Sequence, residues 1–190
     1  MEFVQNAEVL NLLRDQEIAE VPDDEGRVYM QMADGEGVVH LHLAGEQCQS
    51  VPREGARVVA VEKERLAGVV EDIIHKLGLD QVLLIPVGKW RDIFDAVAFS
   101  LAGNEDWQEF DAASTVQLNT RDPLLCEPGS FQTLNALMEA LVSDAEDPKQ
   151  GLMMLTTTAP VLLEFVPDGA VRLSVGRQVL ADEIDEIFEA

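Results

Sequence analysis

Aromatic residues are scarce in this chain of 190 residues, where phenylalanine, tryptophan and tyrosine together make up 5%. Proteins that bind single-stranded nucleic acids stack the bases on aromatic side chains, so a surface of that kind is poorly supplied here. Basic residues are scarce too: 13 Lys and Arg face 36 Asp and Glu, which gives a net charge of −23. So acidic a surface repels phosphate backbones and anionic lipids. We therefore expect neither nucleic acid nor a membrane surface as a partner.

Cysteine is also rare, since Cys48 and Cys126 lie far apart and form no CxxC pair. A small secreted domain stabilised by disulfides would need more of them, so the two indicate reduced thiols in a reducing compartment. No apolar run approaches the roughly 20 residues that a membrane-spanning helix needs. The first residues include an acidic one and lack the basic segment followed by an apolar segment that marks a secretory signal. The sequence thus predicts a soluble, cytoplasmic protein.

Apolar residues, by contrast, make up 47% of the chain, enough to form a real core. Their spacing predicts a helix from the N-terminus that ends before Pro22, and further helices at 66–77, 90–101, 107–110, 131–141 and 180–188. Short extended runs predict strands at 28–32, 38–43, 57–61, 82–85, 115–118, 152–155, 161–166 and 170–175.

The order of these elements predicts a mixed α+β fold, with β-hairpins near both ends and several packed amphipathic helices. The expected hairpins join 28–32 to 38–43 and 161–166 to 170–175. The length fits a single globular domain over residues 1–190. The polar, proline-containing link at 47–56 allows a seam between an N-terminal helix–hairpin unit and the remainder. The two hairpins share a pattern, either through an old duplication or because hairpins in general look alike.

The stretch VVHLHLAGE, residues 38–46, places two histidines two apart with a carboxylate four residues beyond the second. On an extended strand His40 and His42 point to the same side. Two imidazoles and the carboxylate of Glu46 are the ligand types of non-haem iron and zinc sites. HLHLAGE resembles the His-x-His-x3-Glu core of the first cupin motif, with Gly35 just before it. The resemblance implies a mostly β fold and a metal held by these three residues.

The same stretch departs from that family where a second motif should supply another histidine. After the turn Pro167-Asp168-Gly169 the chain has Arg172 in that place, and a protonated guanidinium has no lone pair for a metal. Alternation of apolar residues with the two histidines is also the pattern of a half-buried strand, whose histidines would face open solvent. We prefer the strand interpretation and predict no cofactor.

The turn at 119–122 is the best place in the sequence to look for a small-molecule ligand. It follows a predicted strand, and sites in open α/β sheets lie beyond the carboxyl ends of strands. Asn119, Arg121 and Asp122 are the candidate ligand-binding residues, although turn chemistry alone also favours Asn and Asp here. His75, with Glu71 one helical turn earlier, is either an acid–base residue or part of an exposed helix pair.

No catalytic residue can be named, since the chain has no phosphate-binding loop, no GxGxxG at a helix start and no GxSxG. The last helix carries an apolar stripe among acids and either packs onto the sheet or docks on a partner. The leading hypothesis is a non-catalytic protein-binding or regulatory module, with a protein partner or self-association as a homodimer. The alternative is a metal-dependent or small-ligand-binding enzyme, with its site at His40, His42 and Glu46 or at the 119–122 loop.

Overall fold

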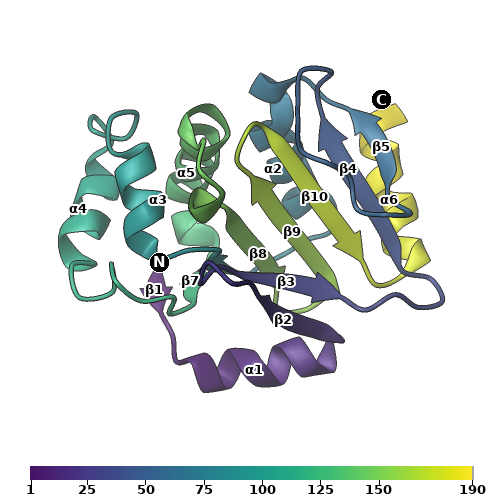
Figure 1. Cartoon of the computed structure of the whole chain (residues 1–190), viewed down its shortest axis with the longest axis horizontal. Helices are drawn as coiled ribbons and strands as arrows, with labels where there is room; N and C mark the ends of the chain where they lie inside the picture. Colours follow the sequence, from purple (N-terminus) through teal and green to yellow (C-terminus); the bar gives the residue numbers. More distant parts are fainter. Residues whose placement is uncertain (190) are drawn as a thin grey trace.

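An eight-stranded sheet forms the centre of the molecule, with a separate two-stranded sheet beside it (Figure 1). The computed structural model describes residues 1–189. The strand order of the large sheet is β1-β7-β6-β8-β9-β10-β4-β5, and every neighbouring pair is antiparallel except β4 and β5. Its strands are β1 (Glu2–Phe3), β4 (Val39–Ala44), β5 (Arg57–Ala60), β6 (Val82–Pro86), β7 (Leu124–Cys126), β8 (Leu152–Thr156), β9 (Val161–Val166) and β10 (Ala170–Val175).

Helices cover one face of this sheet and enclose the larger hydrophobic core. They are α2 (Leu66–Lys76), α3 (Trp90–Val97), α4 (Glu105–Ala113), α5 (Phe131–Asp144) and α6 (Gln178–Glu189), with 3-10 turns at Lys63–Arg65, Pro128–Ser130 and Pro148–Gln150. Their apolar residues face the sheet, except that in α4 the buried Trp107 packs on Phe94 of α3. In α2, for example, Val70 and Ile73 are 0% exposed, and Gly78 with φ +59° takes the left-handed conformation that ends the helix.

On the opposite face of the sheet, one half is covered by α1 (Asn6–Asp15) and the two-stranded sheet of β2 (Ile18–Pro22) and β3 (Val28–Met32) (Figure 1). A second hydrophobic cluster fills this contact. It joins Val9, Leu13, Ile18, Met30 and Met32 to Leu83, Ile85, Val87, Met153, Leu155 and Leu162 of the large sheet.

The α+β class is confirmed, and so are the second hairpin, β9–β10, and the main helices. A hairpin also lies near the N-terminus, but its strands are β2 and β3. The expected pairing of 28–32 with 38–43 is wrong, because β4 pairs with β10 instead. The Gly-rich break between the two runs signals a turn without specifying its partner. Pairing Leu41 and Leu43 with Leu173 and Val171 aligns their apolar side chains in the large core.

The predicted strand at 115–118 is also wrong, because this segment forms consecutive turns after α4. Its backbone groups are satisfied locally: Gln117 N–H donates to Ser114 O and Thr120 N–H to Gln117 O. The Ser114 and Thr115 hydroxyls bond back to carbonyls of α4. Side chains of this type compete with a ladder for backbone groups. The strand of this region is β7, which the sequence pattern did not reveal.

Membrane crossing is not supported by the helices of residues 1–189, none of which combines the length with the apolar character required.

Candidate functional site

A row of polar side chains crosses the sheet on the face opposite the helices. Register sets Arg172 of β10 between Glu164 of β9 and His42 of β4, and sets Ser174 of β10 beside His40 of β4. Strand alternation turns all five side chains to one face, since their neighbours in sequence enter the large core. We call Glu164, Arg172, Ser174, His40 and His42 the polar ladder. Cross-strand neighbours of this kind are close enough to interact directly.

The expectation that the two histidines face open solvent is wrong. His42 is only 2% exposed, and the His40 side chain is 9% exposed. The cause is the connection from β4 to β5. Parallel neighbours cannot be joined by a tight turn, so residues 45–56 must cross a face of the sheet. This covering loop reaches the ladder, where Ser50 Oγ lies 3.4 Å from His42 Nε2 and Val51 O accepts a hydrogen bond from Arg172.

His40 is held on both ring nitrogens. Nδ1 lies 2.8 Å from Ser174 Oγ, and Nε2 lies 2.9 Å from Asp34 Oδ1. Asp34 also accepts a 2.9 Å hydrogen bond from the guanidinium of Arg53 in the covering loop. The His40 hydrogen bond and then the charge of Arg53 lower the pKa of the Asp34 carboxyl. These contacts fasten the loop to β4 and fix the orientation of the imidazole.

His42 sits in a different environment, because its Nδ1 is buried and has no hydrogen-bond partner within residues 1–189. Burial, and then the charge of Arg172, lower the pKa of His42, which keeps the ring neutral. Which of Nε2 and Ser50 Oγ donates in their contact depends on the tautomer of the ring. At 3.4 Å the contact between Ser50 Oγ and Nε2 is long for a hydrogen bond. The Ser50 hydroxyl instead lies 2.9 Å from Cys48 Sγ.

Arg172 and Glu164 form an ion pair of loose geometry. One terminal nitrogen of Arg172 lies 3.4 and 3.3 Å from the two Glu164 oxygens, long for a charge-assisted hydrogen bond. The other donates to Val51 O at 3.0 Å, and the buried Nε has no partner within residues 1–189. Burial raises the pKa of the Glu164 carboxyl, and the nearby Arg172 charge offsets this only in part. The pair is therefore incompletely satisfied.

A cavity of about 300 Å³ opens beside this pair, between the β2–β3 hairpin, β9–β10 and the covering loop. A volume of this size is at the lower end of small-molecule sites. Its walls combine apolar groups with charged and hydroxyl groups: Val21, Tyr29, Met30, Gln31, Arg53, Leu162, Glu164, Arg172 and Ser174. The arrangement can hold a polar group at its ladder side and an apolar group against the hairpin.

The proposed metal ligands are only partly brought together. His40 and His42 share a face of β4, but both ring nitrogens of His40 and the Nε2 of His42 contact protein groups, and Glu46 is exposed beyond the end of the strand. Among residues 1–189 no three His, Cys, Asp or Glu side chains gather in a way that could hold a metal ion. Metal binding by His40, His42 and Glu46 stays a prediction.

The 119–122 turn uses its polar groups inside the fold. The Arg121 guanidinium is half-buried and donates to Pro86 O at 3.0 and 2.9 Å and to Val28 O at 3.0 Å. It thereby ties β6 to β3, and burial lowers its pKa. Asn119 Oδ1 accepts from Arg91 at 3.2 Å, and Asp122 O accepts from the Trp90 indole at 2.7 Å. Ligand binding at Asn119, Arg121 and Asp122 would have to displace these contacts.

His75, the third histidine, lies exposed on α2 with its Nε2 3.6 Å from Glu71, which is the geometry of a helix-surface pair.

Sequence reasoning did not single out Glu164, Arg53 or Asp34. One signal for Glu164 was present, since a lone acid interrupts the otherwise apolar strand VLLEFV. Arg53 and Asp34 come from loops whose path over the sheet is not encoded in a local pattern. No protein-family model, curated protein or solved structure matches the chain, so the candidate site rests on its geometry alone.

Proposed function

We propose that this protein is a non-catalytic protein-binding or regulatory module that engages a basic surface of a protein partner. Uncompensated negative charge carries this proposal. Within residues 1–189, six of the 36 acidic side chains form ion pairs with Lys or Arg: Asp23, Glu25, Asp34, Glu164, Asp185 and Glu186. Most of the carboxylates therefore project an unbalanced field that would speed encounter with a basic partner.

The outer face of α6 is the surface we assign to this contact. The inner face is used within the chain: Ala181 and Ile184 are buried in the large core, and Leu180, Ile187 and Phe188 pack against it. The outer face presents Asp182, Glu186 and Glu189 beside Val179, which is 67% exposed. We call these four residues the α6 acidic face. Acids around one exposed apolar residue suit a complementary basic patch.

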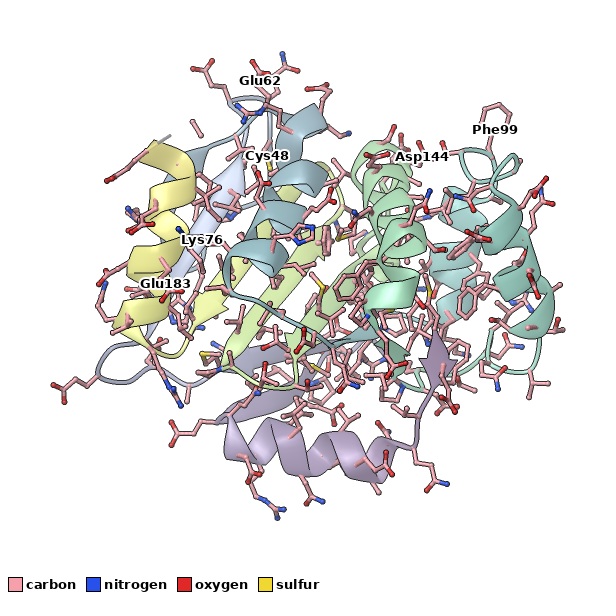
Figure 2. The ribbon with its side chains drawn as sticks, turned by 180° about the vertical axis from the view of Figure 1, so that it is seen from behind. Cys48, Glu62, Lys76, Phe99, Asp144 and Glu183 are labelled. Atoms are coloured by element: carbon pink, nitrogen blue, oxygen red, sulfur yellow. The ribbon has the colours of Figure 1, made fainter. Side chains whose placement is uncertain are left out.

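Two basic residues bond to acids of α6. Lys76 of α2 bonds to Glu186 at 2.6 Å, and Arg57 of β5 bonds to Asp185. Figure 2 shows Lys76 and Glu183 where α2 meets α6. These contacts dock the helix onto its own chain. Lys76 balances one carboxylate of the α6 acidic face, Glu186, while Asp182 and Glu189 form no ion pair with a Lys or Arg within residues 1–189. Apposing two such faces in a homodimer would bring like charges together, which favours a different protein as the partner.

The test compares two variants with the same change of charge. The first, Asp182→Asn/Glu186→Gln/Glu189→Gln, neutralises the α6 acidic face, and the second, Glu105→Gln/Glu109→Gln/Asp111→Asn, neutralises three exposed acids of α4. Each protein is immobilised and used to capture proteins from an extract of the source cells at low salt. We expect the wild type and the α4 variant to capture the same basic protein, and the α6 variant to lose it.

Salt provides a second readout, because raising it to about 1 M shortens the screening length to about 3 Å and should release the partner. Equal capture by the α6 variant, or capture that is insensitive to salt, would contradict the proposal. Sedimentation of the wild type alone should show a monomer.

A further inference from the structure

We propose that the cavity between the β2–β3 hairpin and β9–β10 binds a small aliphatic carboxylate. Its carboxylate group would be held by Arg172 with help from Ser174, and its hydrocarbon part would lie against Val21 and Leu162. This site lies on the opposite face of the sheet from the helices, so it is independent of the protein contact proposed for α6.

The position of the ligand's carboxylate is inferred from the distribution of basic residues. The chain has only 13 Lys and Arg, yet two of them, Arg53 and Arg172, line this one cavity of about 300 Å³. Arg172 has a donor to offer, since its side chain is 33% exposed and one terminal nitrogen makes contacts with Glu164 that are 3.3 and 3.4 Å long. A ligand carboxylate could make shorter charge-assisted bonds, of about 2.7–2.9 Å, to such a guanidinium.

The charge of the ligand is limited by the acids that stand beside these arginines. Glu164 lines the cavity, and Asp34 is bonded to Arg53 at 2.9 Å. A dianion such as a phosphate ester would meet both of these carboxylates as well as the −23 charge of the whole chain. To bind a monoanion, only one guanidinium has to turn from its own carboxylate partner to the ligand. Charge balance therefore favours a monocarboxylate.

The position of the ligand's hydrocarbon part is inferred from the side of the cavity that the β2–β3 hairpin forms. Val21 of β2 is 41% exposed and lines the cavity opposite the strands of the large sheet, where Leu162 is 4% exposed. A short branched hydrocarbon placed there would remove apolar surface from water at about 25 cal/mol per Å². The ligand class that satisfies both ends is a branched aliphatic acid of low molecular weight.

Isothermal titration calorimetry with 4-methylpentanoate tests the proposal, with 4-methylpentanamide as the uncharged match. We expect saturable one-to-one binding of the acid and at least about tenfold weaker binding of the amide, because the amide lacks the charge that Arg172 recognises. Arg172→Gln should weaken the acid by a similar factor. Arg57→Gln, which removes an arginine from an ion pair at the α6 side, should leave binding unchanged.

A second pair of variants keeps the test decisive should Arg172→Gln unfold. Val21→Glu places a carboxylate at the cavity wall on an exposed strand position and should abolish binding of the acid. Val58→Glu makes the same change at a valine of β5 that is 60% exposed and does not line the cavity, so it should bind like the wild type. Equal affinity for acid and amide, no saturable binding at millimolar concentration, or binding unaffected by Val21→Glu would each overturn the proposal.

Discussion

The face of the sheet opposite the helices has two halves, an apolar one on β6 and β8 and a polar one on β9, β10 and β4. On the apolar half, Leu83, Ile85, Met153 and Leu155 lie under α1 and the β2–β3 hairpin. On the other half, the polar ladder lies under the covering loop, residues 45–56. The two halves adjoin at the β8–β9 pair, where Met153 of β8 stands beside Glu164 of β9.

The difference shows that each half is covered by the element that matches its chemistry. The apolar half is covered by regular elements that bring Val9, Leu13 and Met30 into contact with it and bury hydrocarbon. The polar half is covered by an irregular segment, whose backbone and hydroxyl groups are free to contact the ladder. Val51 O accepts from Arg172, and Ser50 Oγ contacts His42. The apolar half therefore stabilises the fold, while the polar half is left with unsatisfied groups and a cavity.

The largest expected effect is a loss of stability on the apolar half. Leu155→Ala removes a side chain that is 0% exposed, and we expect it to lower the free energy of unfolding by about 2–5 kcal/mol. Ser174→Ala on the polar half removes one hydrogen bond to His40 and should cost about 0.5–1.5 kcal/mol. Urea unfolding at pH 7 measures both. Equal losses at the two positions would erase the contrast between the halves.

Breaking the Arg172–Glu164 pair should have an intermediate effect. Arg172→Met leaves a Glu164 side chain that is only 14% exposed without its counter-charge, and we expect a loss of about 1–3 kcal/mol, reduced because Arg172 is itself 33% exposed. The double variant Arg172→Met/Glu164→Leu should recover most of this loss, since it removes both charges together. A double variant less stable than Arg172→Met would show that the pair itself stabilises the fold.

A smaller effect is expected from pH. Burial, followed by the charge of Arg172, lowers the pKa of His42 below 6.5, so the unfolded chain binds more protons than the folded chain between the folded-state pKa and 6.5. The contribution of neutral His42 to stability is therefore complete above pH 6.5 and declines as pH falls below it. We expect His42→Gln to lose less stability than the wild type between pH 7.5 and pH 5.5, as measured by urea midpoints. Parallel pH profiles would indicate an unshifted His42.

The two thiols give a comparison that involves no loss of stability. Cys126 is 0% exposed in the large core, and burial raises its pKa to about 12, whereas Cys48 is partly exposed in the covering loop. Only a thiolate attacks a disulfide reagent, so Ellman's reagent should titrate one thiol in the native protein and two in denaturant. With Cys48→Ser the native protein should not react. Reaction of two native thiols would indicate that the core opens readily.

Much of the fold could be predicted because its signals are local. Asp168-Gly169 between two alternating runs specifies the β9–β10 hairpin, with both residues at positive φ, and the spacing of Val70, Ile73 and Ile74 specifies the buried face of α2. The first hairpin failed because a Gly-rich break says that the chain turns but not which strand it meets. The polar ladder was half visible, since the alternation in β10 already placed Arg172 and Ser174 away from the core.

The sequence by itself determined the α+β class, the excess of acid and the side of β4 on which both histidines stand, because alternation and composition do not depend on distant residues. Tertiary structure alone decided that β4 joins β10, that Glu164 meets Arg172, and that residues 45–56 close over His42. Each of these depends on strands far apart in the chain settling into one register. The alternation of side chains along a strand determines which of them share a face. The contacts of that face are determined only by the strands and loops that pack beside it.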